Sequence, residues 1–423
     1  GLDEQIALVD GKTASLREDE YMVVRVVDGI PRGLPESAGE TLRRLVDEAA
    51  ALPPGTQRMP VEYGGRAEEI SVEPGAYRCD FDPKDLVIGG SAQRGALLSL
   101  LANAHRRFIV HSTFLDAARF ADLIDPIREA CRNGVTFDLL WGADEEEGGE
   151  KRNGKAAAEI AKVVREDREL RGRFKVHMRS TGSHAKLLLC DTPNGNWVAA
   201  VGSCNWLSSP FQAVELTAIL RDQHAVADVA TALQQLVGRR GVLDDIATEM
   251  HVTARDLRRL PAGLGQATVS IVMGATHDKI IREASGRAAR RFVVGSNRLG
   301  STARPGAIMQ GEAAAARPGV AATVMYAYPS GPLKNRHARA LADEAALNGV
   351  RLLKTKIPLH GKFVAWDDDD IVVTSLNWAS ASCDADFPWG EIGIRISGPG
   401  IAANAFHRLA EIYPQLEGVA EEE

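Results

Sequence analysis

The chain contains His184-Ala185-Lys186-Leu187-Leu188-Leu189-Cys190-Asp191 at one point and His360-Gly361-Lys362-Phe363-Val364-Ala365-Trp366-Asp367 at another, and this recurrence indicates how the chain is organised. In both stretches a lysine follows the histidine by two residues, and an aspartate follows the lysine by five. Each stretch leads into a Ser-x-Asn-Trp segment, and a glutamate stands 31 residues after the histidine. These further members are Ser203, Asn205 and Glu215 in the first copy and Ser375, Asn377 and Glu391 in the second. The chain therefore carries one chemical motif twice.

The repeat extends beyond this motif. Arg106-Arg107-Phe108-Ile109-Val110 returns 184 residues later as Arg290-Arg291-Phe292-Val293-Val294, and Gly90 and Gly274 keep the same offset. Repetition at a fixed spacing indicates duplicated structural units. We therefore expect an N-terminal appended domain at residues 1–84, a first unit at 85–241, a helical linker at 242–267 and a second unit at 268–423.

Within each unit, helical patterns alternate with short apolar runs such as Phe108–His111 and Phe137–Trp141, which are typical of buried strands. The amphipathic stretch 116–133 ends at Asn133-Gly134, a helix C-terminal signal. Both motifs lead into an apolar run that predicts a strand, Leu187–Cys190 and Phe363–Trp366. The expected fold class is α/β, with two tandem mixed sheets flanked by helices and related by a pseudo-two-fold axis.

Two segments outside the repeat units carry no chemistry that we can assign. Residues 41–51 of the appended domain have a helical pattern. The linker faintly resembles a helix-turn-helix, but a helix packed across both units is the stronger interpretation.

The composition of the chain limits the classes of protein to which it can belong. The 423 residues are 45% apolar and 25% charged, which excludes a disordered or collagen-like chain. No stretch has the length of a membrane span, so we expect no stable membrane insertion. The five cysteines form no CxxC pair, and their odd number favours a reducing, cytoplasmic compartment. The net charge of −7 argues against a uniformly basic nucleic-acid coat, although a local basic groove is compatible with it. The chain begins with Gly1 rather than Met, which fits a piece excised from a longer protein.

The pattern HxKxxxxD, followed by (G/T)SxNW and a later glutamate, resembles the phospholipase D superfamily over residues 85–415. The resemblance implies two phospholipase D-like units that form one active site within a single chain. It implies His184 as the nucleophile and His360 as the general acid, which then serves as the base that activates water. The phosphate contacts that it implies come from Lys186, Lys362, Asn205 and Asn377, with Ser203 and Ser375 beside them. Glu215 and Glu391 would orient the two histidines, and Asp191 and Asp367 would have a structural role.

These residue types suit the cleavage of a phosphodiester. A neutral imidazole can attack phosphorus and form a phosphohistidine, which divides one difficult displacement into two easier ones. A protonated imidazole can donate to the leaving oxygen, and histidine suits both tasks because its pKa lies near neutrality. Lysines can hold the phosphoryl oxygens as charge shifts onto them. Because two lysines and an imidazolium supply this positive charge, we expect no metal and no cofactor.

Several positions depart from the pattern or allow two interpretations. Thr374 replaces Gly202 and could narrow the approach to the phosphate. We interpret Cys204 as a small buried hydrophobe. Trp206 and Trp378 could stack a base, but beside apolar strands we expect them in the core. The run Asp367–Asp370 resembles a cation site, yet a solvated turn is the stronger interpretation. His111 has no counterpart, because Gly295 stands in its place.

The motif does not identify the substrate. A phospholipase D or phosphatidyltransferase acting on phospholipids would need apolar or amphipathic docking surfaces, and only 5% of this chain is aromatic. A nuclease needs a basic path, and arginines cluster at 106–107, 171–173, 239–240, 255–259 and 287–291. We therefore favour a DNA or RNA phosphodiesterase over a lipid enzyme. A non-catalytic phosphate-binding scaffold is disfavoured, since both His/Lys pairs are intact. The architecture is similar to that of bacterial nucleases that work beside ATPases in phage defence, and this similarity implies an ATPase or helicase as a partner.

Overall fold

The computed structural model of the chain describes residues 25–27, 30–32, 75–142, 149–238, 245–383 and 386–419. Its contacts divide the chain into two units, Gly1–Pro74 and Gly75–Glu423. In the first of these, strands β1 (Arg25–Val27) and β2 (Ile30–Arg32) pair antiparallel. The helix expected at 41–51 lies outside the described residues.

Two mixed sheets form the second of these units. The sheet of the first repeat has seven strands in the spatial order β4 (Leu86–Ile88), β10 (Leu216–Leu220), β9 (Trp197–Gly202), β8 (Leu187–Asp191), β5 (Arg107–Ser112), β6 (Thr136–Trp141) and β7 (Phe174–Val176). The sheet of the second repeat has eight strands in the order β14 (Val350–Lys354), β13 (Ala321–Pro329), β12 (Arg291–Leu299), β15 (Phe363–Trp366), β16 (Asp370–Thr374), β17 (Ile392–Ser397), β11 (Ala267–Met273) and β3 (Tyr77–Cys79).

The two sheets repeat one topology. Matching β4–β10 of the first repeat with β11–β17 of the second, in chain order, gives the same neighbours in both sheets. In each, three strands are parallel (β5-β6-β7 and β12-β13-β14), and the motif-bearing strand runs antiparallel to the first of them. This confirms the duplicated α/β fold predicted from the sequence.

Strand β3 has no counterpart in the sheet of the first repeat. It pairs antiparallel with β11, with Cys79 opposite Ala267 and Tyr77 opposite Val269. We expected the appended domain to end at residue 84, whereas the compact unit begins at Gly75. The difference has a simple cause. Without β3, β11 would be an edge strand with unpaired backbone groups, and the chain just before β4 satisfies them.

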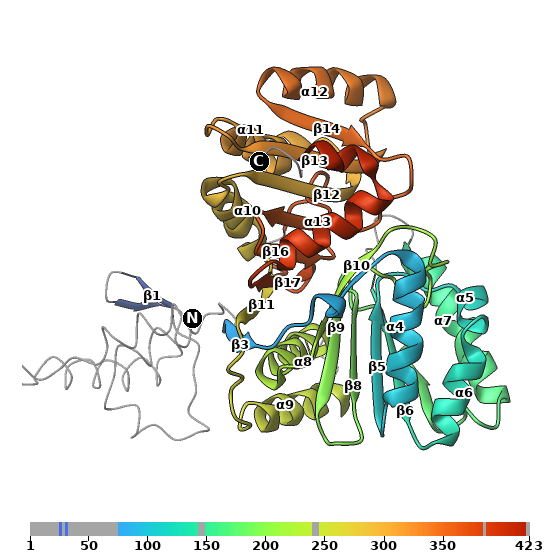
Figure 1. The fold of residues 1–423 in the computed structure, drawn as a ribbon. Coiled ribbons are helices and arrows are strands. Elements are labelled where there is room, and N and C mark those ends of the chain that lie inside the picture. The colour runs from blue at the N-terminus through green and yellow to red at the C-terminus, as the bar shows by residue number, and fades with distance from the viewer. Residues whose placement is uncertain are drawn as a thin grey trace, which may run out of the picture. The chain divides into compact units, whose positions relative to one another are not determined.

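Helices cover both sheets. They are α4 (Gly90–Asn103), α5 (Ala117–Ala121), α6 (Ile124–Arg132), α7 (Gly149–Glu166), α8 (Gln223–Gly238), α9 (Asp245–Leu257), α10 (Thr276–Arg287), α11 (Met309–Ala315), α12 (Asn335–Leu347) and α13 (Ile401–Ile412). Figure 1 shows α8 and α9 on one face of the first sheet and α4–α7 on the other. The amphipathic stretch 116–133 forms two helices, α5 and α6, because Pro126 lacks an N–H and is tolerated only in the first turn of a helix.

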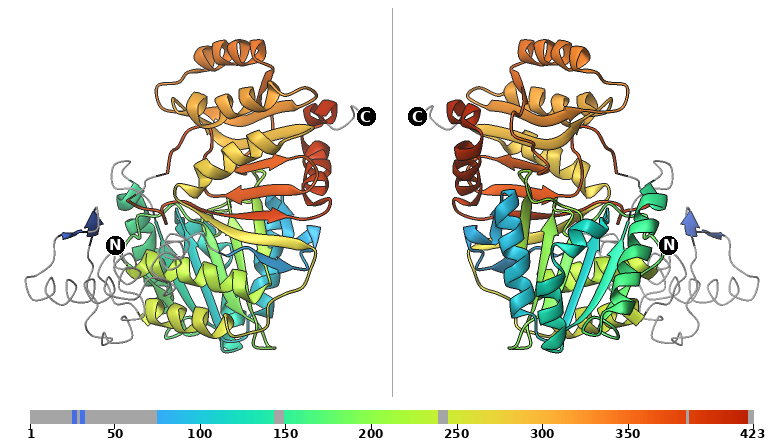
Figure 2. Two further views of the ribbon diagram at one scale, coloured as in Figure 1. Left: turned by 90° about the vertical axis from the view of Figure 1, so that its left-hand side faces the viewer. Right: turned by 90° about the vertical axis from the view of Figure 1, so that its right-hand side faces the viewer.

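A shared core joins the two repeats. It contains residues of both sheets together with the apolar faces of α8, α9 and α13, among them Val201, Leu233, Met250, Val373 and Leu409. Separate cores fill the space between each sheet and its outer helices. The views in Figure 2 show the sheets stacked, with strands of different direction in the two halves. Burial of this extended apolar layer fixes one half against the other.

The linker contributes helix α9, which packs against α8 through Met250 and Ala254. Its Glu249 accepts two hydrogen bonds from Arg107 on β5, at 2.6 Å from Nε and 2.7 Å from Nη2. The Arg107 guanidinium also lies 2.6 Å from Asp138. These contacts hold the linker helix on the first repeat.

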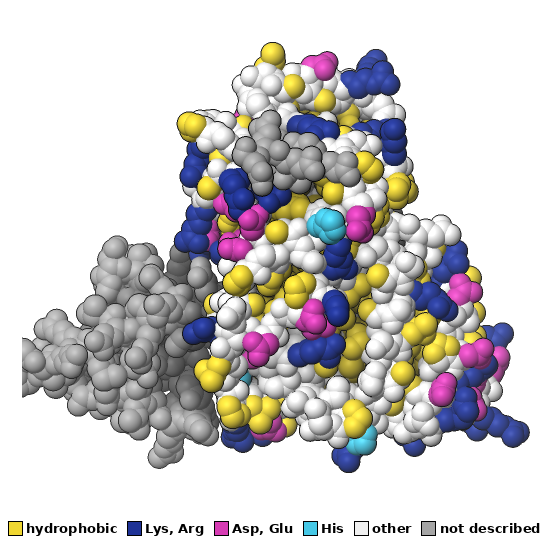
Figure 3. Space-filling model, viewed as in Figure 1, with side chains coloured by type: hydrophobic (Ala, Val, Ile, Leu, Met, Phe, Trp, Pro, Cys, Tyr) yellow, Lys and Arg dark blue, Asp and Glu magenta, His cyan; other side chains and the backbone are white. Residues whose placement is uncertain are grey.

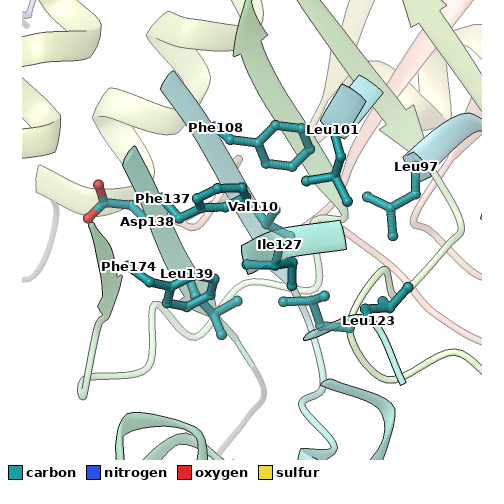
Figure 4. Close-up of a pocket in the computed structure, with 11 residues that line it drawn as sticks. Leu97, Leu101, Phe108, Val110, Leu123, Ile127, Phe137, Asp138, Leu139 and Phe174 are labelled. Carbon is teal, nitrogen blue, oxygen red and sulfur yellow. The ribbon is translucent and has the colours of Figure 1, made fainter. Parts of the chain in front are cut away.

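An apolar pocket lies between the first sheet and its outer helices (Figure 4). Its lining includes Leu97 and Leu101 of α4 and the rings of Phe108, Phe137 and Phe174. Neighbouring rings lie 5.1 and 5.4 Å apart, centroid to centroid. A lining of this kind stabilises the core and offers nothing to bind a phosphate.

Candidate active site

The two HxK motifs lie at equivalent edges of the two sheets. His184 and Lys186 come just before β8, and His360 and Lys362 come just before β15. Since β8 is antiparallel to β5, its first residue lies opposite His111, near the end of β5. Phe363 of β15 likewise lies opposite Gly295 of β12. Both predicted strands are therefore confirmed, with the motif at the edge where the parallel strands end.

At this edge each half holds the backbone of the other half's motif. The carbonyl of Val214 accepts hydrogen bonds from the backbone N–H of His360 at 2.9 Å and of Gly361 at 2.7 Å. In the other direction, the N–H of His184 donates to the carbonyl of Gly390 at 2.7 Å. Val214 and Gly390 each stand one residue before a motif glutamate. Each half thus places its motif glutamate next to the motif of the other half.

The result is a crossed pairing of histidines and carboxylates. His360 Nδ1 lies 2.7 and 2.8 Å from the two carboxylate oxygens of Glu215, which belongs to the first repeat. His184 Nδ1 lies 3.3 Å from Oε1 of Glu391, which belongs to the second repeat. A carboxylate on Nδ1 keeps the proton on that nitrogen and presents the Nε2 lone pair outward. Glu215 and Glu391 are therefore placed to orient the histidines, each from the opposite half.

The motif serines contact the motif glutamates. Ser203 Oγ donates to Glu215 at 2.5 Å, and Ser375 Oγ donates to Glu391. Each hydroxyl also accepts a backbone N–H, from Leu216 or from Ile392, at 3.0 Å. We expected both serines beside the phosphate. A hydroxyl has one proton to donate, and here it goes to the carboxylate, so the serines hold the glutamates; their place beside a bound phosphate stays a prediction.

Both lysines are buried and converge on one site. Lys186 Nζ donates to Thr113 Oγ1 and to the carbonyl of His184, each at 2.7 Å. Lys362 Nζ donates to the carbonyl of His360 at 2.6 Å and lies 3.3 Å from His360 Nε2. Burial, followed by the charge of Lys186, lowers the pKa of Lys362 to about 7. Burial lowers the pKa of Lys186 as well, against the charges of Glu391 and Glu215. Two buried ammonium groups close together are unfavourable on their own and are stabilised by a bound anion. The site is therefore suited to binding an anion.

The carboxylates and His360 respond to the same surroundings. Burial would raise the pKa of Glu215, but the charge and hydrogen bond of His360 and the charge of Lys362 hold it below its usual value. Glu391 behaves alike, with His184 and Lys186 overcoming burial to lower its pKa. Burial lowers the pKa of His360, although Glu215 opposes this shift. Both carboxylates are thus ionised, and His360 favours its neutral form in the free protein.

The motif asparagines are placed alike in the two halves. The carbonyl of Asn205 accepts the N–H groups of Ser208 and Ser209, and that of Asn377 accepts those of Ser380 and Ala381. The side-chain Oδ1 atoms of both asparagines are buried and accept no hydrogen bond from the described residues. A phosphodiester oxygen cannot donate to these acceptors, so the unpaired Oδ1 atoms do not by themselves indicate a phosphate contact. Any contact to a phosphate oxygen would come from the amide nitrogen, which is the donor.

Polar contacts fix the first motif more tightly than the second. His111 Nδ1 lies 2.7 Å from the carbonyl of Ala185, and its Nε2 lies 2.7 Å from Thr181 Oγ1. Thr113 Oγ1 donates to the carbonyl of His184 at 2.7 Å. Burial lowers the pKa of His111 to about 4, so this ring is neutral and holds the motif through hydrogen bonds. The equivalent positions in the second repeat carry Gly295 and Asn297. His111 drew attention in the sequence because it lacked a counterpart, whereas Thr113 gave no signal.

The motif aspartates lie at the ends of β8 and β15 that are farthest from the motif histidines. Asp191 Oδ1 accepts the backbone N–H groups of Arg106 at 2.8 Å and Arg107 at 2.7 Å. Asp367 Oδ1 accepts those of Ala289, Arg290 and Arg291, at 3.0, 2.8 and 3.2 Å. These carboxylates satisfy the loops that enter β5 and β12. Their contacts are structural.

The remaining uncertain positions are settled by their surroundings. Trp206 and Trp378 are buried in the cores, as predicted, and Cys204 is buried too. Thr374 is fully buried and its Oγ1 lies 2.8 Å from His277 Nε2, so it does not narrow a phosphate approach. The space for it comes from Gly393 directly opposite, where a Cβ would lie 2.6 Å from that of Thr374.

The aspartates after β15, Asp367–Asp370, form hydrogen bonds and ion pairs with other parts of the protein. Asp368 pairs with Arg290 and Arg291, Asp369 accepts the N–H of Gly400, and Asp370 pairs with Arg395. Among residues 75–142, 149–238, 245–383 and 386–419, no group of three or more His, Cys, Asp and Glu side chains is arranged to hold a metal ion. No helix in these same ranges is long and apolar enough to span a membrane.

Comparison with known proteins finds a family model that matches part of the chain and solved structures of similar fold. Residues 97–237 match the family model described as cardiolipin synthase, PLD-like domain. The solved phosphatidylserine synthase of Haemophilus influenzae Rd KW20 is similar in fold, with a TM-score of 0.53 and 13% identity over 82% of this chain and 90% of that chain. A mutant of yeast tyrosyl-DNA phosphodiesterase 1 aligns with a TM-score of 0.45 and 10% identity over 71% of this chain and 84% of that one. No curated protein matches the sequence at a significant level.

Proposed function

We propose that this chain is a phosphodiesterase of the phospholipase D superfamily, whose PLD-like family model matches residues 97–237, and that it cleaves DNA or RNA through a covalent phosphohistidine, without a metal ion. The observation that carries the proposal is the crossed pairing, His184 with Glu391 and His360 with Glu215, around two buried lysines. The site thus holds two oriented imidazoles and the positive charge that a phosphodiester requires. All of these groups come from one chain.

His184 is the better nucleophile of the pair. Its side chain is 43% exposed, against 25% for His360. Its Nε2 has no hydrogen-bond partner among the described residues, and its backbone is fixed by Gly390 and Thr113. His360 Nε2 instead lies next to Lys362 Nζ, a source of protons. The asymmetry supports attack by His184 and proton transfer by His360.

In the first step, the Nε2 lone pair of His184 forms a bond to phosphorus as the bond from phosphorus to the leaving oxygen breaks. His360 donates its Nε2 proton to that oxygen. In the second step, neutral His360 takes a proton from water, the resulting hydroxide bonds to phosphorus, and the N–P electron pair returns to His184. Both histidines end as they began.

The lysines act on the phosphoryl oxygens and on the proton of His360. Lys186 is held by Thr113, so its charge stays fixed at the site. Lys362 Nζ lies 3.3 Å from His360 Nε2, and a bound phosphate favours the protonated form of both groups because it is an anion. The lysine charges are already in position where the phosphoryl oxygens become more negative. They therefore lower the activation barrier, because no group has to reorganise during the reaction.

The choice of nucleic acid rests on surface charge. Most arginine clusters noted in the sequence are neutralised: Arg107 by Asp138 and Glu249, Arg291 by Asp368, and Arg258 by Asp228. Support comes instead from the second repeat. Its segments 284–311, 313–342 and 345–366 contain no Asp or Glu and include the strands that end beside the site. A backbone of phosphates is attracted to such a surface.

The alternative is transfer of a phosphatidyl group. It would use the same first step and pass the group from His184 to water or to an alcohol. The solved protein of similar fold from Haemophilus influenzae is named a phosphatidylserine synthase. Because the reacting groups would be the same, the substrate has to be tested directly.

The decisive experiment offers labelled single-stranded DNA, duplex DNA, RNA and phosphatidylcholine vesicles in EDTA. We expect cleavage of nucleic acid, unchanged by the chelator, and no release of choline. Loss of activity in EDTA that Mg²⁺ or Mn²⁺ restores would contradict the metal-free mechanism. Activity on vesicles alone would establish the lipid alternative.

A pH profile tests the part of Lys362. Burial and the charge of Lys186 lower its pKa to about 7, so in the free enzyme this lysine is charged below that pH and neutral above it. The value of kcat/KM should therefore fall above about pH 7, roughly tenfold per pH unit where that ionisation dominates. Lys362→Arg keeps its charge and should lose this limb, while its kcat drops because a guanidinium does not give up a proton. An unchanged alkaline limb in the variant would assign the ionisation to another group.

A further inference from the structure

We propose that the second repeat carries a platform for a single strand of nucleic acid beside the active site. The platform consists of Arg298 and Tyr328, flanked by Lys354 and Lys356. The inference rests on the proposed function and goes further, since it names where the strand lies and which contacts hold it. In this arrangement a base stacks on Tyr328 and the adjoining phosphates meet the cationic side chains.

The topology brings these residues to one edge of the sheet. Arg298 lies opposite Tyr328 near the ends of β12 and β13, and Lys354 lies opposite Tyr326 at the end of β14. These three strands are parallel, so their ends share the edge at which β15 begins. His360 and Lys362 stand just before β15. The platform and the second motif therefore lie at the same edge.

Hydrogen bonds link the platform to the motif segments. The N–H of Ala379 donates to Ser296 Oγ, and the carbonyl of Ala379 accepts the N–H of Gly300 at 2.7 Å. Ala379 follows the Asn377-Trp378 pair of the motif. From Lys354 the chain passes through Thr355, whose N–H donates to the carbonyl of Tyr326 at 2.8 Å, and reaches His360 six residues later. The platform is thus fixed on both sides by segments that carry active-site residues.

The chemistry of the platform suits a base and its phosphates. The Arg298 guanidinium lies 5.7 Å from the centroid of the Tyr328 ring, a cation–π contact. Tyr328 nevertheless stays 45% exposed, which is unusual for a large side chain at the end of a buried strand. Proteins that bind single strands combine an exposed aromatic ring with a positively charged track. Tyr328 and its neighbours supply both.

The ends of β12 and β14 and the residue pair that follows β14 contribute positive charge to this edge. Arg298, Lys354 and Lys356 are exposed, and Lys354 Nζ donates to the neutral amide of Asn335 rather than to a carboxylate. Lys334, Arg336 and Arg339 at the start of α12 are exposed as well. Figure 3 shows Lys and Arg side chains gathered at one end of α12 and below it. The nearest acids in the sequence of α12, Asp343 and Glu344, come two turns later.

The equivalent edge of the first repeat has a different character. Phe114 occupies the position that matches Arg298, and it is 39% exposed. In the sequence, four acidic residues, Asp144-Glu145-Glu146-Glu147, follow the last residue of β6 closely, whereas no acidic residue closely follows Tyr328. A polyanion would therefore extend over the second repeat. A lipid surface would instead favour several exposed apolar side chains, and on the platform edge of the second repeat Ile357, 43% exposed, stands among lysines.

The test compares binding and catalysis in matched variants. Binding of a short fluorescein-labelled single-stranded DNA is followed by anisotropy in a His184→Ala background, which prevents cleavage. Tyr328→Ala should weaken binding by about 5- to 100-fold, since one stacked base contributes that much, and Tyr328→Phe should retain it. Lys354→Ala with Lys356→Ala should reduce the slope of log K against log salt by about 0.7 for each lysine. Arg351→Ala, exposed at the opposite end of β14, is the charge-matched control.

The outcomes separate the inference from the proposed function. With His184 restored, hydrolysis of bis(p-nitrophenyl) phosphate should be unchanged by Tyr328→Ala, because this small diester needs only the catalytic groups. Unchanged DNA binding in the Tyr328 and lysine variants would overturn the platform and leave the phosphodiesterase proposal standing. Loss of binding to anionic vesicles, with DNA binding intact, would also overturn it in favour of a lipid surface. An enzyme that cleaves neither the small diester nor DNA would contradict the proposed function, and anisotropy would still decide the platform.

Discussion

His184→Ala should abolish both turnover and the covalent adduct, whereas His360→Ala should lose turnover and still form the adduct. The nucleophile supplies the bond to phosphorus, so nothing replaces it in the first variant. The general acid only assists departure of the leaving oxygen, and its loss costs about 10²–10⁴-fold on an ordinary alkoxide. A nitrophenolate departs without a proton. With such a substrate the His360→Ala enzyme should therefore accumulate phosphohistidine, because the base that activates water is also missing.

Mass spectrometry of the acid-labile adduct in the two variants measures this directly. His251→Ala, an exposed position on α9, is the control that should behave as wild type. An adduct mapped to His360, with none at His184, would reverse the two roles. It would also mean that the tighter polar fixing of the first motif, through His111 and Thr113, serves the acid rather than the nucleophile.

The duplication is what made the fold predictable. Equal spacing of His, Lys, Asp and Glu in two places required two similar units, and the apolar runs at Leu187 and Phe363 required strands after both motifs. Short runs of this kind, bounded by turns, have little alternative to a buried strand. The same strand order in both sheets then follows, because two units of similar sequence pack their strands and helices in the same way.

Features that differ between the two repeats could not be found by comparing the repeats with each other. Thr113 fixes Lys186 and the backbone of His184, but its counterpart is Asn297, so comparison of the repeats did not mark it. Arg298 and Tyr328 are 30 residues apart in the sequence. Their contact depends on the register of two parallel strands, which no local pattern records. Strand β3 was likewise hidden, since three residues that satisfy an exposed sheet edge have no periodicity of their own.

The serines show why a shared motif does not fix a role. Ser203 and Ser375 were expected beside the phosphate, yet their protons go to Glu215 and Glu391. Each carboxylate is buried and ionised and needs several donors to remain so. The serine hydroxyl is the nearest donor once the glutamate has crossed the interface. That crossing is a property of the assembled halves and is absent from either repeat alone.

Exchange of the two glutamates for glutamine should therefore give effects that follow the crossed pairs rather than the repeats. Glu215→Gln lies in the first repeat but should resemble His360→Ala, with slow turnover and an adduct that still forms from a nitrophenyl substrate. Glu391→Gln lies in the second repeat but should slow formation of the adduct at His184. Each should lose about 10²–10⁴-fold in kcat, since an amide no longer holds the proton on Nδ1 or stabilises the imidazolium.

A double-mutant cycle makes the pairing quantitative. Because Glu215 acts through His360, adding Glu215→Gln to His360→Ala should cost little more in adduct formation than either change alone. Adding Glu391→Gln to His360→Ala should multiply the two losses, since Glu391 acts on the other histidine. Glu129→Gln, exposed on α6, should be silent in every background. If Glu215→Gln instead blocked the adduct and Glu391→Gln spared it, each glutamate would serve the histidine of its own repeat. The backbone hydrogen bonds that His360 donates to Val214 and that His184 donates to Gly390 argue against that result, because they already place each glutamate on the far side of the interface.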